Sequence, residues 1–261
     1  MKIAITGKGG VGKTTIAGSL ARYFASQGIE VLAIDADPSL NLASSIGIPE
    51  EIRKRIVPIS EMKDLIAERT ESQLGSYGTF FKMNPTVSDI PDRYVEEYKG
   101  VKLLVMGAVE KGGKGCICPE SVLLKNLVNH LLIARKSYLI MDMEAGTEHL
   151  GRATAKSVDA FLIVVEPGKR SIEMARTIQK LALDIGITET YIIGNKISDD
   201  SEKEFIKENF GDQLIATFFL DKGVKTADLK SQSPFDLGSE EFLNEIKNIA
   251  LKLEQIKNSQ N

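Results

Sequence analysis

The stretch GKGGVGKTT, residues 7–15, decides the fold of this chain, because it follows an apolar run, KIAIT (2–6), and leads into a helical pattern. Its G-x-x-x-x-G-K-T spacing is that of a phosphate-binding loop, and a strand before it with a helix after it is the context that this motif requires. Glycines let successive backbone N–H groups point at phosphate oxygens, and the helix N-terminus adds its dipole. We therefore predict a nucleotide site whose cradle consists of Gly9, Gly10, Val11, Gly12, Lys13, Thr14 and Thr15.

Outward from this loop, short apolar runs alternate with helical patterns along the chain. Most runs are continuously hydrophobic, which suits strands of a sheet that is covered on both faces. We predict an α/β fold with a mostly parallel central sheet and helices on both faces, in one domain that spans residues 1–261. The expected strands are 2–6, 31–35, 102–109, 138–142, 160–167, 191–197 and 214–220, and the expected helices include 14–28, 121–135 and 171–186.

Composition narrows the possible partners. The 261 residues are 43% apolar and 26% charged with a net charge of −3, so no basic footprint points to nucleic acid or to an acidic membrane. No apolar run reaches the length of a membrane span, and the N-terminus lacks a signal-peptide pattern. We expect a cytoplasmic protein without nucleic-acid or membrane partners. Residues 50–100 do not follow the alternation and form either a partner surface or a covering loop.

Acidic residues end two of the expected strands. Asp142 closes YLIMD (138–142), and Asp35 and Asp37 lie in IDADP (34–38), at the sheet edge where the phosphate loop begins. We predict that Lys13 binds the β- and γ-phosphates, that Thr14 and Asp142 bind Mg²⁺, and that Asp37 orients the attacking water. Taken singly, each aspartate would also suit a turn or a helix cap.

Only two cysteines occur, Cys116 and Cys118, just before an expected helix. A thiolate near a helix N-terminus has a lowered pKa and binds metal more readily. Two sulfurs cannot complete a tetrahedral site, but a two-fold dimer would supply four. Thiolates suit Zn²⁺, Cu⁺, Fe–S clusters and Ni²⁺, and two half-buried apolar residues or a disulfide remain the plainer alternatives.

Lys8, directly after the first glycine, gives the loop a second lysine, and GKGGVGKTT thereby resembles the deviant phosphate loop of partition and metallocluster-assembly ATPases. That group includes the Min- and Par-type ATPases and the nitrogenase iron protein. The resemblance covers nearly the whole chain, with IDADP as switch I, DMEAG as switch II and GNK at Asn195 as an adenine-reading segment. It implies that ATP is the nucleotide and that the active form is an ATP-sandwiched homodimer. In such a dimer, Lys8 would act on the partner's nucleotide as an arginine finger does.

Cys-x-Cys together with MDMEAGTEHLGR (141–152) resembles, more narrowly, the nickel-insertion ATPases that mature carbon monoxide dehydrogenase. The resemblance implies a Ni²⁺ or Zn²⁺ site at Cys116 and Cys118, shared across the dimer, and carbon monoxide dehydrogenase as the client. A Min/Par-type positioning switch and an iron–sulfur carrier are the alternatives. Residues 239–261 are amphipathic with a mixed Glu/Lys polar face, which favours a core-packing helix over a membrane-binding one. The matching switch II positions are Asp142, Glu144, Ala145, Gly146, Glu148 and His149.

Overall fold

The central element is one twisted sheet. The computed structural model of the chain describes residues 1–37, 41–72, 80–107, 118–134, 138–144 and 157–259. Within these residues eight strands form the sheet in the order β3-β4-β2-β5-β1-β6-β7-β8. All neighbouring strands are parallel except β3 and β4, which confirms the predicted fold class. The strands are β1 Lys2–Gly7, β2 Val31–Ala36, β3 Glu96–Tyr98, β4 Val101–Val105, β5 Tyr138–Met143, β6 Ala160–Val165, β7 Thr190–Ile197 and β8 Leu214–Phe219.

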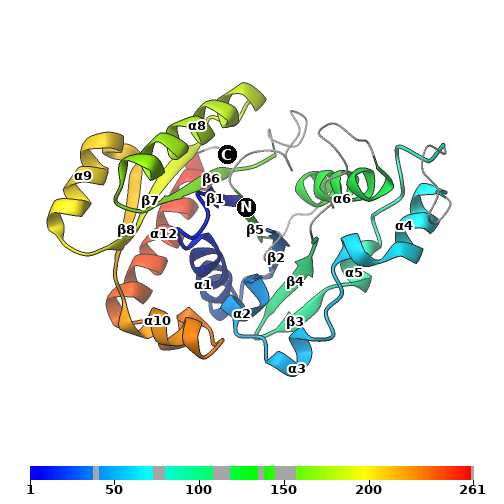
Figure 1. Ribbon diagram of the computed structural model, residues 1–261, viewed down its shortest axis with the longest axis horizontal. Helices are drawn as coiled ribbons and strands as arrows, with labels where there is room; N and C mark the ends of the chain where they lie inside the picture. Colours follow the sequence, from blue (N-terminus) through cyan, green and yellow to red (C-terminus); the bar gives the residue numbers. More distant parts are fainter. Residues whose placement is uncertain (38–40, 73–79, 108–117, 135–137, 145–156, 260–261) are drawn as a thin grey trace.

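Helices cover both faces of this sheet (Figure 1). One apolar layer contains α1, α2 and α12, and the other contains α4, α6, α8 and α9. Central strands buried on both sides need apolar residues at every position, which explains their unbroken hydrophobic runs. The helices are α1 Lys13–Ser26, α2 Leu42–Ile46, α3 Glu50–Arg53, η1 Ile59–Glu61, α4 Lys63–Thr70, α5 Ile90–Arg93, α6 Pro119–Ala134, α8 Lys169–Ile185, α9 Asp200–Phe210, η2 Gly211–Gln213, α10 Lys222–Leu229, α11 Pro234–Leu237 and α12 Glu240–Ser259.

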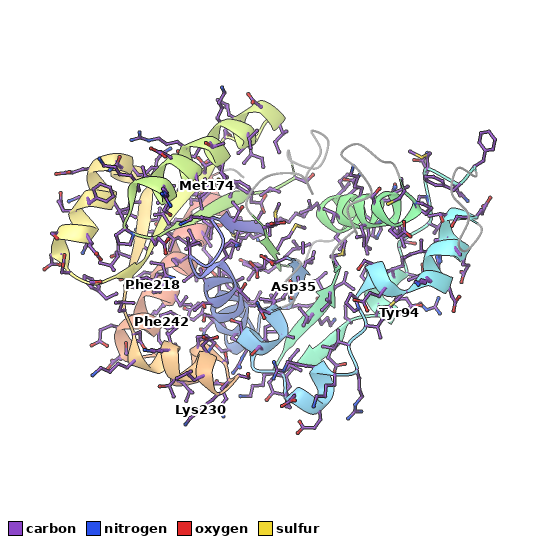
Figure 2. All side chains as sticks on the ribbon, viewed as in Figure 1. Asp35, Tyr94, Met174, Phe218, Lys230 and Phe242 are labelled. Atoms are coloured by element: carbon purple, nitrogen blue, oxygen red, sulfur yellow. The ribbon has the colours of Figure 1, made fainter. Side chains whose placement is uncertain are left out.

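The first and last helices pack on the same face of the sheet. Ile16, Leu20 and Phe24 of α1 are fully buried there, as their shared face predicted. The apolar stripe of α12 is buried in the same layer, and its Phe242 ring lies 5.2 Å from that of Phe218 in β8, where Figure 2 labels both. The expectation that the C-terminal segment is a core-packing helix is therefore confirmed.

Three details differ from the sequence-based expectation. The strand expected at 102–109 begins at Val101 and ends at Val105, and the strand expected at 160–167 ends at Val165. The short edge strand β3 was not predicted, because its three residues, Glu-Glu-Tyr, carry no apolar run. The described part of residues 50–100 otherwise contains short helices, and Arg69 and Asp89 join α4 to α5 through two 2.8 Å hydrogen bonds. Assignment of residues 1–261 to one domain stays a prediction.

The sheet register brings the acidic strand ends together. Asp35 of β2 and Ile5 of β1 are both paired with Asp142 of β5, which lies between them. Strand β1 continues into the phosphate loop at Gly7. Since parallel strands end at a common edge, the loop and the two carboxylates share one side of the molecule.

Candidate nucleotide site

The phosphate loop leads directly into α1, whose first residue is Lys13. Gly10 and Gly12 have φ angles of 80° and 100°, in the left-handed region that favours glycine. A Cβ atom on Gly12 would also lie 2.2 Å from Asn195 Nδ2. The second glycine of the motif is therefore required by both its backbone conformation and its close neighbour.

Lys13 and Asp37 form an ion pair across the mouth of the loop. Lys13 Nζ lies 3.6 Å from Asp37 Oδ2, and both residues are buried but line the same cleft. An ammonium group at this position could bind anionic phosphate oxygens together with the backbone N–H groups of the loop. The structure thus brings together two residues that were predicted to be catalytic.

Thr14 and Asp142 form the second predicted pair. Thr14 donates its hydroxyl hydrogen to Asp142 Oδ2 at 2.6 Å, while the buried Asp142 Oδ1 has no hydrogen-bond partner among the described residues. The pKa of Asp142 is raised to about 8, chiefly by burial; the nearby carboxylates Asp35 and Asp37 also raise it, whereas the Thr14 hydrogen bond and Lys13 lower it. A hydroxyl and an under-used carboxylate are oxygen ligands that suit Mg²⁺. The residues present therefore fit this cation.

Asp35 has a different role from Asp37, although both belong to IDADP. The Asp35 carboxylate is fully buried and accepts hydrogen bonds from the backbone N–H groups of Asp37 (3.3 Å) and Leu42 (3.0 Å). Burial raises its pKa to about 7. Figure 2 shows Asp35 near the centre of the molecule. It holds both ends of the segment between β2 and α2, whereas Asp37 faces Lys13.

Two consecutive residues near the end of β7 donate hydrogen bonds to backbone carbonyls of the phosphate loop. Asn195 Nδ2 donates to the Val11 carbonyl at 2.7 Å, and Lys196 Nζ donates to the Gly10 carbonyl at 2.6 Å. Both residues also line the cleft. Asn195 was predicted as an adenine reader and lies against the loop, while the Lys196 contact was not predicted.

Lys8 is held within its own chain. Its Nζ lies 3.3 Å from Glu166 Oε1, directly after β6, and both side chains are partly exposed. Glu166 was missed in the sequence, although it follows the apolar run of an expected strand as Asp142 and Asp35 do. The position of a carboxylate at the same sheet edge is the signal that could have identified it.

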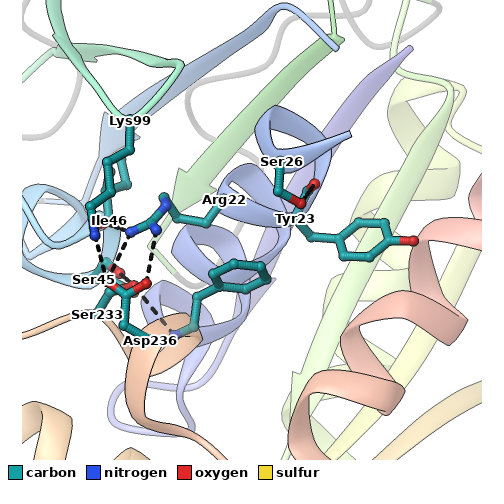
Figure 3. A network of polar contacts seen from close by, with 9 residues as sticks. Arg22, Tyr23, Ser26, Ser45, Ile46, Lys99, Ser233 and Asp236 are labelled. Carbon is teal, nitrogen blue, oxygen red and sulfur yellow. Dashed lines mark hydrogen bonds and ion pairs between the residues drawn. The ribbon is translucent and has the colours of Figure 1, made fainter. Parts of the chain in front are cut away.

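A network behind the loop joins α1 to α2 and α11 (Figure 3). Ser45 donates its hydroxyl hydrogen to the Thr14 carbonyl at 2.8 Å, and Ser233 donates to the Ser45 carbonyl at 2.7 Å. Arg22 bonds the Ile46 carbonyl and both carboxylate oxygens of Asp236. These contacts fix the first turn of α1 to the C-terminal part of the chain.

The loop opens into a cleft of about 820 Å³, within the usual size range for small-molecule sites. Loop residues and Asp37 form one wall, and the segment from Phe219 to Asp228 forms another. Phe219 and Leu220 are substantially exposed there. The cleft therefore combines a polar phosphate end with two exposed apolar side chains, Phe219 and Leu220, that a nucleotide base could contact.

The predicted cysteine site is only partly visible. Cys118 is half-buried just before α6, and its Sγ accepts a hydrogen bond from the Ser121 N–H at 3.4 Å. Across the parts of the chain that the structure describes, no three His, Cys, Asp or Glu side chains gather as a metal site. Cys116 and the switch II residues Ala145, Gly146, Glu148 and His149 lie outside the described residues.

The loop, its lysine and the Thr14–Asp142 pair at the carboxyl edge of a parallel sheet define a P-loop ATPase. The family model described as "CobQ/CobB/MinD/ParA nucleotide binding domain" matches residues 2–235, and the chain belongs to this family.

Two curated relatives are similar over most of their length. The carbon monoxide dehydrogenase accessory protein CooC of Rhodospirillum rubrum is 46% identical over 239 residues, which cover 91% of this chain and 90% of that protein. An uncharacterized ATP-binding protein of Methanocaldococcus jannaschii is 47% identical over 227 residues, covering 86% and 87%. Among solved structures, the MinD cell division protein of Aquifex aeolicus has a TM-score of 0.68 at 20% identity and covers 98% of each chain. This last likeness concerns the fold alone.

None of the helices in the described residues is long and apolar enough to cross a membrane.

Proposed function

We propose that this ATPase is an accessory protein of carbon monoxide dehydrogenase maturation that inserts nickel into its client. The observation that carries the proposal is the match, over nine-tenths of both chains, to the R. rubrum carbon monoxide dehydrogenase accessory protein. The Cys-x-Cys pair directly before α6 agrees with a metal cargo, because thiolates bind Ni²⁺ and Zn²⁺.

In the proposed reaction, Lys13 and the N–H groups of residues 9–15 bind the phosphates of ATP. Thr14 and Asp142 would hold Mg²⁺, which would neutralise negative charge on the phosphates. Asp37 orients the attacking water, and its 3.6 Å contact with Lys13, the residue assigned to the phosphates, supports this role. Asn195 contacts the adenine base, and its side chain lines the same cleft.

Dimerisation couples this chemistry to the metal. Lys8 leaves Glu166 and reaches the nucleotide of a second copy, where it neutralises negative charge that develops during hydrolysis. The Lys8–Glu166 pair is partly exposed, so its separation costs little, since exposed ion pairs contribute at most about 1 kcal/mol. The same two-fold arrangement would bring two Cys116–Cys118 pairs together and supply four sulfur ligands.

The test is a titration of the reduced chain with Ni²⁺ and, separately, Zn²⁺, in the presence of ADP, ATP or neither. Mass measurement follows the oligomeric state, and the variant Cys116→Ser/Cys118→Ser runs in parallel. Ser121→Ala is the matched control, because Ser121 is half-buried beside Cys118 but supplies no thiolate. We expect one metal ion per dimer, nucleotide-dependent affinity, loss of uptake in the double variant and normal uptake in the control.

Other outcomes point elsewhere. ATP-driven dimers without metal uptake would contradict nickel insertion and favour the positioning-switch alternative, to be followed with lipid vesicles and DNA. Brown protein with iron and sulfide in stoichiometric amounts would favour an iron–sulfur carrier. If metal binding is found, transfer is tested by adding nickel-free carbon monoxide dehydrogenase and measuring its activation with and without ATP.

A further inference from the structure

Lys196 has two unusual features that occur together. Its backbone φ angle is 59°, in the left-handed region that a lysine rarely adopts, and its Nζ lies 2.6 Å from the carbonyl oxygen of Gly10. The β7–β8 pairing shifts register between Gly194 and Ile197, so Lys196 lies within the irregularity. A non-glycine residue in this conformation costs backbone free energy and persists where the surroundings require it.

The side chains of Asn195 and Lys196 both contact backbone carbonyl oxygens of the phosphate loop. Lys196 binds the Gly10 carbonyl, and the preceding Asn195 binds the Val11 carbonyl, so two adjacent side chains hold two adjacent loop carbonyls. A carbonyl oxygen turned toward the nucleotide would repel anionic phosphates. While Asn195 and Lys196 engage these two carbonyls, the oxygens are kept from turning toward the phosphates, and the loop N–H groups can bind them.

Charge makes the lysine contact stronger than a neutral one. An ammonium group that donates to a carbonyl oxygen forms a charge-assisted hydrogen bond. Such a bond is shorter and stronger than a hydrogen bond from a neutral amide N–H to the same oxygen. Gly10 itself has a φ angle of 80° and offers no side chain to fix its conformation. The ammonium group of Lys196, which lies outside the loop in sequence, is therefore suited to keep Gly10 in place before the nucleotide binds.

We propose that Lys196 is a positioning residue that holds the phosphate loop through the Gly10 carbonyl, and that its contribution to nucleotide binding is directed at the phosphates and not at the base. It deepens the ATPase assignment and does not depend on the metal cargo. Within the segment GNK, both side chains contact loop carbonyls, and Lys196 supplies the charged one of the two contacts.

The test compares ligands that share phosphates but differ in the base. Affinities for ATP, ADP and inorganic tripolyphosphate are measured by calorimetry for wild type, Lys196→Met and Lys196→Arg. Lys196→Met keeps the aliphatic stem and removes the ammonium. We expect about tenfold weaker binding of all three ligands, in proportion to a lost charged hydrogen bond, with partial recovery in Lys196→Arg. Lys207→Met is the control, because Lys207 is an exposed lysine on α9 that does not line the cleft.

A second variant separates the loop contact from backbone strain. Lys196→Gly removes the ammonium but accepts the positive φ, so its melting temperature without nucleotide should be at least that of Lys196→Met, while its affinity loss should be equal. The proposal is overturned if ATP binding weakens while tripolyphosphate binding is unchanged, because Lys196 would then act on the base. It is equally overturned if Lys196→Met, folded as judged by its melting curve, binds every ligand as wild type does.

Discussion

Helices α1 and α6 both begin beside residues that were predicted to be functional, but they start in different surroundings. The first turn of α1 is fixed from several sides, by Asp37 on Lys13, Asp142 on Thr14 and Ser45 on the Thr14 carbonyl. The described contacts of Cys118 before α6 are local, with Ser121 only three residues away. One chain thus builds a nearly complete nucleotide site, whereas its two cysteines supply at most half of a tetrahedral metal site.

The largest expected effect comes from a substitution in the nucleotide site at the start of α1. Lys13→Met should lower ATP hydrolysis at least about 100-fold, because it removes the cation that stabilises charge on the phosphates. Phosphate release at saturating ATP measures this loss, with Lys207→Met as a control of equal charge change. Metal uptake by the nucleotide-free variant should stay at the wild-type level. A hydrolysis rate within threefold of wild type would rule out the assigned role of Lys13.

Asp142→Asn tests the same nucleotide site through protein stability as well as ATP hydrolysis. We expect hydrolysis to fall about as far as in Lys13→Met, because a ligand of Mg²⁺ is lost, while the nucleotide-free chain becomes about 1 kcal/mol more stable. The stability gain follows from removing a carboxylate that burial disfavours in its charged form.

The pH dependence of this gain has a definite sign. Burial raises the pKa of Asp142 from its ordinary 3.8 to about 8, so between these values the folded chain binds the proton more tightly than the unfolded one. Wild-type stability should therefore fall relative to Asp142→Asn as pH rises from about 4 to 8. Melting curves in EDTA from pH 5 to 8 give the difference, and Asp35 is present in both proteins. A constant difference across this range would contradict the assigned burial effect.

Leu20→Ala in α1 and Leu127→Ala in α6 form a matched pair on opposite faces of the sheet. Both side chains are fully buried, so each variant should lose about 2–5 kcal/mol of unfolding free energy in urea. Only Leu20→Ala should also weaken ADP binding severalfold, because α1 carries Lys13 and Thr14 in its first turn. Equal effects of the two variants on ADP affinity would show that the nucleotide site depends on the whole core and not on the seating of α1.

The same contrast explains how much the sequence could predict. The loop, Lys13, Thr14 and Asp142 could be predicted to lie together because a local spacing and the ends of apolar runs specify their places. Glu166 and Lys196 were missed as partners, since their contacts with Lys8 and Gly10 cross 158 and 186 residues. The edge strand β3 was missed because an exposed three-residue strand carries no hydrophobic pattern. Local motifs identify the groups that meet the ligand, whereas the groups that hold a motif in place depend on the folded topology.

The network around Arg22 should respond more weakly (Figure 3). The buried Arg22 guanidinium donates two hydrogen bonds to the Asp236 carboxylate, from Nη2 at 2.9 Å and from Nη1 at 3.2 Å. It also donates a hydrogen bond to the Ile46 carbonyl. Arg22→Lys keeps the charge but cannot reproduce the planar fork, so we expect a loss of about 1–3 kcal/mol in urea unfolding. ADP affinity should fall by less than in Leu20→Ala, because the contact of this network with Thr14 is an indirect one that passes through Ser45.

Lys99→Ala should have the smallest effect of all. Lys99 Nζ lies 3.0 Å from Asp236 Oδ2, but both side chains are more than a third exposed, and such pairs contribute up to about 1 kcal/mol. The pKa of Asp236 lies below its ordinary value. Burial alone would raise this pKa, but the hydrogen bonds from Arg22 and Lys99 lower it by more. The stability that these bonds add is present above the ordinary pKa and is lost as pH falls through the lowered one. The difference in unfolding free energy between wild type and Lys99→Ala in urea should therefore be at most a few tenths of a kcal/mol at pH 7 and should vanish in acid. A difference that persists at pH 2 would instead assign the effect to the Lys99 ammonium, which lies 5.6 Å from the centre of the Tyr98 ring.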